Sequence, residues 1–517
     1  MKVAVYNEHL STAGGGEKYM GSIVEYLVAK GHSVDLISGK EVDASIFDRL
    51  NLNMGACNIL NANDFGVSVS EKSSEYDLFL NVTYQSQLIP RAKHNAIVIF
   101  FPIIPSVKIL AKSRAVHGLL RFIDSVRSVE FVSGMNAEEK IGAYHKRRFG
   151  NWSKREFSFV LRDRRKKRRP SNVFIHTLPL RGGDLKGLIR EIRVGDRPAD
   201  FSVRGPVIAV PLRLGQANDV VTVRLKSVLE SDRDGRELGI FITGVSERGT
   251  VLTRIGSLLR NLLHDVLTYD YLWHYETVIT ISRYSESWLK RMWNRDSRIL
   301  FPSVDTDKFS FSEGKKKIIV SCGRFFEGGH NKKHLFMIRM FKRMYDAKML
   351  TGWEYHVCGG THPEKNHQEY LGKVKKSAEG YPIFIHEDIE LEALRSLYAE
   401  ATVFWHAAGF GESEKLHPDK FEHFGITTVE AMSAGCIPLV INRGGQKEIV
   451  TDGIDGYLFD TDREMMAKMA KIGIMTDEER RAISARAREH SDRFSREAFA
   501  TRMDEIFRTI NRTGQDD

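Results

Sequence analysis

Residues 3–37 read VAVYNEHLSTAGGGEKYMGSIVEYLVAKGHSVDLI, and the order of elements in this stretch points to one fold class. The apolar run at 3–6 predicts a short buried strand, the glycines at 14–16 predict a loop, and residues 19–29 have the pattern of a helix. A second strand is expected at 33–37. Strand and helix that alternate in this way indicate a parallel, doubly wound sheet.

The same alternation continues to about residue 110 and returns in the C-terminal half. Further buried strands are expected at 77–80, 96–100, 317–321, 354–358, 383–385, 403–405 and 437–441. In the segment 113–251, short strand-like pieces follow one another with only Gly, Pro and Asp turns between them, which favours a mostly-β module in the form of a small sandwich. We therefore expect an α/β chain with two Rossmann-like doubly wound domains and this module inserted in the N-terminal one.

A chain of 517 residues is long enough for about three domains. We place the first part of the N-terminal domain at 1–112, the inserted module at 113–251 and the second part of the N-terminal domain, which includes a helix at 252–267, at 252–303. The C-terminal domain follows at 304–492. The last segment, 493–517, is expected to be a helix that packs back toward the N-terminal domain.

The composition is that of a soluble globular chain, with 42% hydrophobic and 28% charged residues. No apolar run approaches the roughly 20 residues that a membrane helix needs, and no secretory signal is visible at the start. The four cysteines form no CxxC pair, so neither a disulfide framework nor a zinc site is suggested. We expect a cytoplasmic protein.

The net charge of +10 comes from one segment, 146–169, which holds twelve Lys and Arg against two acidic residues. Seven of the eight residues at 162–169 are basic. Three interpretations stay open: a solvated loop, contact with anionic lipid headgroups, and binding of nucleic acid.

Glu422 and Glu430, eight residues apart in EHFGITTVE, are the most informative pair in the C-terminal half. The pattern places Glu430 in the first turns of a helix that begins near Ile426, and Glu422 in the loop before it. Carboxylates beside a free helix N-terminus suit a sugar nucleotide, because they accept from sugar hydroxyls while the helix amides bind diphosphate. The alternative is a solvated Glu422 and a Glu430 that merely favours the helix dipole.

Arg324 and Lys332 lie about eight residues apart, on a strand end and in the following loop. Such cations can clamp a diphosphate leaving group, or they can simply be solvated at the surface. The N-terminal glycine loop precedes a helix and can accept an anion, or it can be a tight turn with no ligand.

Together these motifs resemble the family-4 retaining glycosyltransferases of GT-B architecture, and most closely the α-mannosyltransferases that extend lipid-linked oligosaccharides. The resemblance covers roughly 1–110 and 250–517. It rests on Gly-Gly-Gly-Glu at 14–17, Gly-Arg at 323–324, Asn-Lys-Lys-His at 331–334, the stretch from Glu422 to Gly435, Gly-Gly at 444–445 with Glu448, and the segment 452–459.

The resemblance implies a role for each matching residue. Arg324 and Lys332 would hold the donor diphosphate, with Lys333 as the alternative register, Glu422 would bond the donor sugar hydroxyls, and Glu430 the ribose hydroxyls. The remaining donor contacts would come from the amides at the helix start, the nucleobase loop and the N-terminal loop: Gly425, Ile426 and Thr427; Asp388 and Ile389; Gly15 and Gly16.

The resemblance also implies a metal-independent hexosyltransferase without a cofactor. Its donor would be a GDP- or UDP-linked sugar, with mannose favoured, and its acceptor a glycan or lipid-linked glycan. The segment 146–169 would hold it to the inner face of a membrane, and nucleic acid is not the expected partner. A catalytically silent GT-B scaffold that binds sugar nucleotides, or a nucleic-acid-binding protein, is the alternative.

One departure from the family concerns Phe100, which stands where these enzymes usually carry a histidine that faces the sugar. Two other features are expected to be unrelated to the chemistry. Asp305-Thr-Asp307 resembles a metal-binding Asp-x-Asp but lies in a stretch similar to the family's interdomain crossover. The histidines at 176, 274 and 406 are expected to be satisfied locally.

Overall fold

The computed structural model describes residues 1–8, 10, 14–39, 41–42, 45–50, 52–84, 86, 88–104, 129–141, 148–161, 172–177, 184–212, 220–230, 237–246, 269–312, 314–328 and 330–512. The chain divides into two compact units, Met1–Ile103 with Tyr271–Asp517, and Ile104–Asp270. The expected helix at 252–267 and the basic run at 162–169 lie outside the described residues. The finer domain boundaries given above stay predictions.

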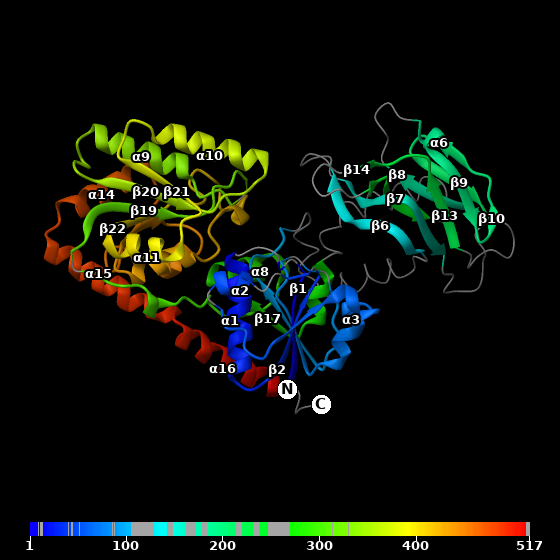
Figure 1. Cartoon of the computed structure of the whole chain (residues 1–517), viewed down its shortest axis with the longest axis horizontal. Coiled ribbons are helices and arrows are strands. Elements are labelled where there is room, and N and C mark those ends of the chain that lie inside the picture. The colour runs from blue at the N-terminus through cyan, green and yellow to red at the C-terminus, as the bar shows by residue number, and fades with distance from the viewer. Residues whose placement is uncertain are drawn as a thin grey trace. The chain divides into compact units, whose positions relative to one another are not determined.

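The first sheet of the larger unit is parallel throughout, with strand order β18-β17-β5-β4-β1-β2-β3 (Figure 1). Its strands are β1 (Lys2–Asn7), β2 (Ser33–Ser38), β3 (Asn58–Asn61), β4 (Leu78–Asn81), β5 (His94–Ile99), β17 (Thr277–Thr280) and β18 (Arg298–Ile299). Every residue of β4 is buried, as expected for a central strand that is covered on both faces.

Helices cover both faces of this sheet, with α1 on one side and α3 on the other (Figure 1). The helices are α1 (Gly15–Ala29), α2 (Ser45–Arg49), α3 (Val69–Lys72) and α8 (Arg283–Trp293), with 3-10 turns η1 (Ala62–Phe65), η2 (Ser73–Glu75) and η3 (Tyr269–His274). Because α1 begins at Gly15, directly after Gly14, the N-terminal glycine loop leads straight into the helix.

The second sheet is also parallel, with order β21-β20-β19-β22-β23-β24. This is the order that dinucleotide-binding folds have. Its strands are β19 (Lys316–Cys322), β20 (Glu354–Gly359), β21 (Ile383–Glu387), β22 (Ala401–His406), β23 (Ile437–Ile441) and β24 (Tyr457–Phe459). The prediction of two Rossmann-like doubly wound domains is confirmed.

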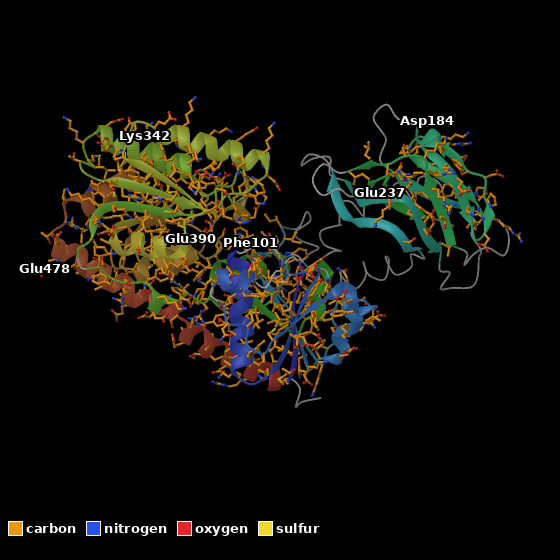
Figure 2. The ribbon with its side chains drawn as sticks, in the orientation of Figure 1. Phe101, Asp184, Glu237, Lys342, Glu390 and Glu478 are labelled. Carbon is orange, nitrogen blue, oxygen red and sulfur yellow. The ribbon has the colours of Figure 1, made fainter. Side chains whose placement is uncertain are left out.

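The helices of this half lie on both faces of the second sheet, with α9 and α10 on one face and α11 on the other (Figure 1). They are α9 (His334–Asp346), α10 (Lys365–Ala378), α11 (Leu391–Glu400), α12 (Ile426–Ser433), α13 (Gln446–Ile449), α14 (Asp462–Ile474) and α15 (Asp477–Ser491), with turns η4 (Thr306–Lys308), η5 (Pro418–Lys420) and η6 (Asp492–Phe494). Figure 2 shows the side chains that fill the space between these layers.

The smaller unit is mostly β, as predicted. Its antiparallel strands join in one nine-stranded sheet, β10-β9-β13-β7-β16-β8-β12-β11 with β6 beside β7, so the two separate large sheets of the expected sandwich are not seen in the described residues. Alternate residues of strands such as β8 and β13 are buried and pack in one apolar cluster with Phe157 and Phe159. One face of this sheet therefore supplies the apolar core of the smaller unit.

The elements of this unit are β6 (Val129–Ile141), β7 (Arg148–Leu161), β8 (Asn172–Thr177), β9 (Ile189–Val194), β10 (Arg197–Pro198), β11 (Ser202–Arg204), β12 (Val207–Pro211), β13 (Val220–Leu225) and β16 (Phe241–Ser246), with the short helix α6 (Leu185–Leu188) and a separate hairpin of β14 (Leu229–Glu230) and β15 (Glu237–Leu238).

The last helix, α16 (Arg496–Arg512), packs against α1 of the first sheet. Tyr26 donates its hydroxyl hydrogen to Asp504 at 2.5 Å, and Lys30 lies 2.7 Å from the same carboxylate. The ring of Phe507 contacts Tyr26 at 5.9 Å between centroids. The C-terminal helix is thus anchored on α1 by one polar cluster and one aromatic pair.

Among the described residues, no helix combines the length and the apolar composition that crossing a bilayer requires.

Removal of the Tyr26 hydroxyl tests the anchoring of α16. A hydrogen bond to a charged group contributes roughly 1.5 kcal/mol or more, so Tyr26→Phe is expected to raise the local opening equilibrium of residues 496–512 by about tenfold. Hydrogen–deuterium exchange of that helix measures the change. Tyr345→Phe, which removes a hydroxyl with no protein partner in the described part of the chain, is the control. Equal exchange in both variants would contradict the assignment.

Candidate functional site

Two neighbouring strands of the second sheet end where the predicted donor residues gather. β19 ends at Cys322 and is followed by Gly323 and Arg324, while its parallel neighbour β22 ends at His406. The strand order reverses between them, since β20 lies beyond β19 and β23 beyond β22. Doubly wound proteins bind ligands outside the carboxyl ends of the strands at such a switch point.

Glu422 lies at this switch point with two polar partners. Lys332 donates to Glu422 Oε2, and His406 Nε2 is 3.0 Å from the same oxygen. Burial alone would raise the pKa of Glu422, but the Lys332 ammonium and the His406 hydrogen bond outweigh it and hold the pKa well below its usual range. Burial lowers the pKa of His406, so this ring is neutral and its Nε2–H is the donor. Glu422 is therefore a half-buried acceptor whose ionised form is favoured by its partners.

The two adjacent lysines before α9 have different partners. Lys332 contacts Glu422, whereas Lys333 Nζ lies 2.9 Å from Glu412, a carboxylate that Lys420 also contacts at 2.9 Å. The backbone of Lys333 is left-handed, with φ of 61°, which turns consecutive side chains in different directions. Lys332 therefore lies beside Glu422 with His406, whereas Lys333 lies beside Glu412 instead.

Two glycines hold the backbone of Glu422 in place. Gly445 donates its N–H to the Glu422 carbonyl at 2.7 Å. A Cβ on Gly444 would lie 2.4 Å from that carbonyl oxygen, and a Cβ on Gly445 would lie 2.5 Å from Phe424 Cα. The Gly-Gly pair is therefore required by close backbone contact under the Glu422 segment.

The start of α12 exposes backbone donors next to Glu422. Gly425 is the N-cap residue and provides no side-chain cap, so the first-turn amides of Ile426 and Thr427 lack that partner. Gly425 has φ of 121°, and a Cβ there would lie 2.3 Å from the Gln446 amide, so no other residue fits. Thr427 also reaches the carbonyl of Cys322 at 3.4 Å, which ties α12 to the end of β19.

Glu430, one turn further along α12, faces a cation from the first sheet's half of the unit. Lys18 of α1 lies 3.8 Å from Glu430 and 3.7 Å from the buried Asp305, which is also bonded to Arg496. Burial raises the pKa of Glu430, Lys18 opposes this effect, and Asp305 adds to it. The carboxylate of Glu430 can therefore accept further hydrogen bonds besides its contact with Lys18.

The N-terminal glycine loop approaches the same helix. A Cβ on Gly15 would lie 3.4 Å from Ile426 Cδ1, and one on Gly16 would lie 3.8 Å from the Phe100 ring. Phe100 packs edge-on against Tyr19 at 5.6 Å between centroids. The structure therefore brings Gly15 close to Ile426, and Gly16 close to the apolar ring of Phe100.

Arg324 and the predicted nucleobase loop lie on the other side of the switch point. The guanidinium of Arg324 is exposed, 5.8 Å from the Phe326 ring centre, and it has no ion-pair partner in the part of the chain that the structure describes. Asp388 accepts from Thr361 N at 2.8 Å and from its hydroxyl at 2.5 Å. The carboxylate of Asp388 therefore shapes its own loop, while Ile389 packs against the apolar core.

Two further glycines lie against the predicted site residues. A Cβ on Gly323 would lie 2.6 Å from Lys332 Cγ, and a Cβ on Gly360 would lie between Asp388 Oδ1 at 3.7 Å and Arg324 Cγ at 3.8 Å. Because Gly323 has no Cβ, the aliphatic part of the Lys332 side chain can pack against its backbone, next to Arg324. Direct contacts thus join Lys332 to Glu422 and bring Gly15 close to Ile426, whereas the carboxylate of Asp388 is bonded to Thr361.

A carboxylate of the second half caps a helix of the first. Glu448 accepts from the backbone N–H groups of Arg283 at 2.8 Å and Tyr284 at 2.7 Å, at the start of α8. Burial raises the pKa of Glu448, and these two backbone donors oppose that effect. Glu448 therefore helps to hold the two halves of this unit together.

Four site residues were missed by sequence reasoning: His406, Lys18, His423 and Phe101. His406 was expected to be satisfied locally, but it is the hydrogen-bond partner of Glu422. Its position at the carboxyl end of a buried parallel strand was the signal that could have found it. Lys18, on the first turn of α1, carried no signal in the sequence.

His423 and Phe101 meet across the two halves of the unit. Their rings stack at 4.2 Å between centroids with 11° between planes. Burial, the nearby His330 and Lys332 lower the pKa of His423 to about 3, so the ring is neutral. His423 follows Glu422 directly, so this stack helps to fix the site segment against the first half.

The C-terminal half of the chain matches a known protein family. Residues 303–490 match the family model described as glycosyl transferases group 1. Among curated proteins, the GDP-Man:Man(3)GlcNAc(2)-PP-Dol alpha-1,2-mannosyltransferase of Xenopus laevis is 28% identical over 240 residues, which are 43% of this chain and 46% of that protein. The chain spans about half the length of the curated relatives it matches.

Solved structures agree over the whole chain. The sucrose-phosphate synthase of Thermosynechococcus elongatus aligns with a TM-score of 0.52 at 13% identity, over 99% of this chain and 100% of that one. Anabaena Alr3699/HepE, solved with UDP and glucose, aligns with a TM-score of 0.50 at 11% identity, over 98% of this chain and 99% of that one. These likenesses confirm the predicted GT-B fold. The chain therefore carries a glycosyl transferase group 1 domain at residues 303–490.

Proposed function

We propose that the chain is a glycosyltransferase that moves a hexose, with mannose as the first candidate, from a nucleotide-diphosphate sugar to a lipid-linked glycan. The observation that carries this proposal is the half-buried, ionised Glu422 with Lys332 and His406, beside the uncapped N-terminus of α12. This arrangement offers both an acceptor for sugar hydroxyls and donors for a diphosphate.

The diphosphate of the donor would be held by three groups. Lys332 and the exposed guanidinium of Arg324 supply positive charge, and the first amides of α12 supply backbone donors at the positive end of the helix. As the bond between the anomeric carbon and the phosphate oxygen breaks, negative charge develops on that oxygen. Fixed cations at this place stabilise the departing nucleoside diphosphate.

The sugar would lie against Glu422, with the ribose at Glu430. Glu422 remains ionised at neutral pH, so it accepts from sugar hydroxyls and orients the ring. Glu430 would accept from the ribose hydroxyls, with the glycine loop at Gly15 and Gly16 approaching from the other half. Asp388 would shape the nucleobase loop through Thr361 rather than contact the base with its carboxylate.

The transfer step needs a base, and Phe100 cannot supply one. We infer a retaining, front-face reaction in which the acceptor oxygen attacks the anomeric carbon as the phosphate oxygen leaves, and the acceptor proton passes to the departing phosphate. One carbon–oxygen bond forms, one breaks, and no metal or cofactor takes part in this proposal.

The names of the relatives support the choice of substrates. The Xenopus protein is named as an enzyme that uses GDP-Man and an acceptor on dolichyl diphosphate. We therefore propose GDP-mannose as the donor over a UDP-sugar, and a lipid-linked oligosaccharide as the acceptor. We place the protein in the cytoplasm, at the inner face of a membrane, with the segment 146–169 against anionic headgroups.

A silent scaffold is the second candidate, and the apolar environment of Phe100 favours it. Such a protein would bind the donor with the same residues but would catalyse no transfer. Binding without turnover over a panel of acceptors would establish this alternative.

The adjacent lysines provide a matched test of the donor site. Lys332→Ala removes a cation from Glu422 and from the proposed diphosphate position, so mannose transfer from GDP-mannose is expected to fall roughly 100-fold or more. Lys333→Ala removes a cation that contacts Glu412 instead and is expected to retain most of the activity. Steady-state kcat/KM measures both. Equal losses in the two variants would mean that Lys332 has no special role.

A thermal-shift panel of GDP-, UDP-, ADP- and dTDP-sugars tests the donor. GDP-mannose at 100 times its dissociation constant is expected to stabilise the protein by about 2.7 kcal/mol. Arg324→Ala and Glu430→Ala should need much more ligand for the same shift, with Lys333→Ala as the control. A larger shift with a UDP-sugar would overturn the donor assignment, and unchanged shifts in both variants would overturn the site.

Co-sedimentation with vesicles tests the membrane surface. Each basic residue near an anionic surface contributes roughly 1 kcal/mol, so replacing the seven Lys and Arg of 162–169 by Ser is expected to abolish binding to phosphatidylserine vesicles. Lys375→Gln with Lys376→Gln, two exposed lysines of α10, is the control. Loss of oligonucleotide binding with unchanged vesicle binding would favour a nucleic-acid partner instead.

A further inference from the structure

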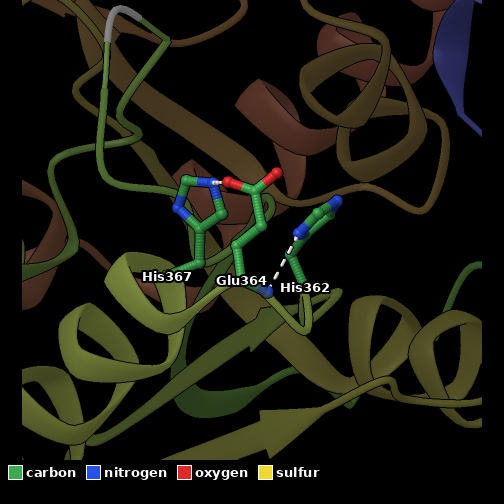
Figure 3. Close-up of side chains that lie close together, drawn as sticks. All are labelled: His362, Glu364 and His367. Carbon is green, nitrogen blue, oxygen red and sulfur yellow. Dashed lines mark hydrogen bonds and ion pairs between the residues drawn. The ribbon is translucent and has the colours of Figure 1, made fainter. Parts of the chain in front are cut away.

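Three side chains of the types that can bind a metal ion lie close together at the carboxyl edge of the second sheet (Figure 3). His362 follows β20, Glu364 is the N-cap residue of α10, and His367 lies in the first turn of that helix. One potential ligand atom from each side chain lies within 4.8 Å of the other two. This triad is separate from the residues that the donor site uses.

The geometry needs little adjustment to hold an ion. His367 Nε2 is 3.5 Å from Glu364 Oε2, and the two imidazole rings are 5.3 Å apart between centroids, nearly perpendicular. Ligands at about 2.0–2.2 Å from one ion lie roughly 3–4 Å from one another. Small rotations of the exposed His362 and Glu364 side chains bring all three ligand atoms to such distances.

Of the three side chains, His367 is held in place by its surroundings. His367 is 3% exposed, and its ring stacks on Phe326 at 4.2 Å between centroids. The other two side chains are exposed, so an ion can reach the triad from solvent and keep an open coordination position. The triad therefore combines one buried ligand with two that solvent can reach.

We propose that His362, Glu364 and His367 form a reversible site for a divalent transition-metal ion, and that its occupancy changes the loop that carries Arg324. Two imidazoles and one carboxylate suit Zn²⁺ and its neighbours, whereas Mg²⁺ and Ca²⁺ prefer oxygen ligands alone. The ion takes no part in the proposed transfer step.

The link to Arg324 follows from the tautomer of His367. Glu327 donates its backbone N–H to His367 Nδ1 at 3.2 Å, so the ring proton of the metal-free state lies on Nε2, which faces Glu364. Coordination through Nε2 requires that nitrogen to lose its proton. The neutral ring then carries the proton on Nδ1, and the Glu327 hydrogen bond breaks.

The broken bond lies three residues from Arg324, on the same loop. Phe326, which stacks on His367, also lies 5.8 Å from the Arg324 guanidinium. Ion binding therefore alters two contacts that hold this loop. This part of the inference rests on the proposed function, because it assumes that Arg324 binds the donor diphosphate.

Calorimetric titration of the untagged, metal-free chain with Zn²⁺ tests the site. We expect one saturable equivalent in the wild type. His362→Ala and Glu364→Gln change exposed side chains and should fold normally. Each should weaken binding by more than the roughly 10–100-fold that loss of an outer-shell partner costs. Glu369→Gln, the same change on an exposed residue of the same helix, is the control.

Visible absorption of the Co²⁺-loaded chain reports the coordination directly. Wild type and Glu369→Gln should give the intense bands of a four-coordinate ion, and His362→Ala should lose them. Absence of saturable Zn²⁺ binding in the wild type, or equal binding in His362→Ala, would overturn the site.

The coupling has its own test. The affinity for GDP is compared between the metal-free chain and the chain loaded with one Zn²⁺ and desalted. Coupling predicts a change in affinity for the wild type and none for His362→Ala, and linkage requires GDP to change Zn²⁺ affinity by the same factor. Zn²⁺ binding with unchanged GDP affinity would overturn the coupling alone. Zn²⁺ binding with no GDP binding in any variant would overturn the proposed function, and the coupling with it, but leave the metal site standing.

Discussion

The site depends on one half-buried carboxylate that stays charged. Glu422 is partly removed from water, which opposes ionisation, and it remains ionised because Lys332 and His406 both reach the same oxygen. An unpaired charge in such a place destabilises the folded protein far more than a paired one. Loss of Lys332 or His406 would therefore leave Glu422 without a partner that it needs. They come from the loop before α9, from the end of β22 and from the loop before α12. The pairing therefore fixes the relative positions of three segments that are distant in the sequence, and the glycines at 444 and 445 give the backbone room to do so.

The two halves of the larger unit also contact each other through charged groups. Glu430 meets Lys18, and Glu448 accepts the first amides of α8. Burial raises the pKa of both carboxyls, and their donors oppose that effect. The stacked pair of Phe101 and His423 adds an apolar contact beside the charged ones. The same helix, α12, thus offers backbone donors to a ligand at its start and a carboxylate to the other half one turn later.

Much of the fold and part of the site follow from local patterns. Buried parallel strands read as apolar runs, and the Glu422–Glu430 spacing placed a loop residue and a helix residue correctly around the start of α12. The choice between Lys332 and Lys333 depends on the left-handed backbone at Lys333, which no sequence pattern reveals. His406 and Lys18 contribute through partners 16 and 412 residues away in the chain, so only the tertiary structure could identify them. The inserted unit was predicted as β from its turns, but the pairing of its strands in one sheet depends on long-range register.

The most direct test of the central claim is an experimental structure of the chain with GDP-mannose bound. We expect the diphosphate within hydrogen-bonding distance of Lys332, Arg324 and the first amides of α12, with hexose hydroxyls donating to Glu422. A nucleotide bound elsewhere, or a donor sugar that makes no contact with Glu422, would contradict it.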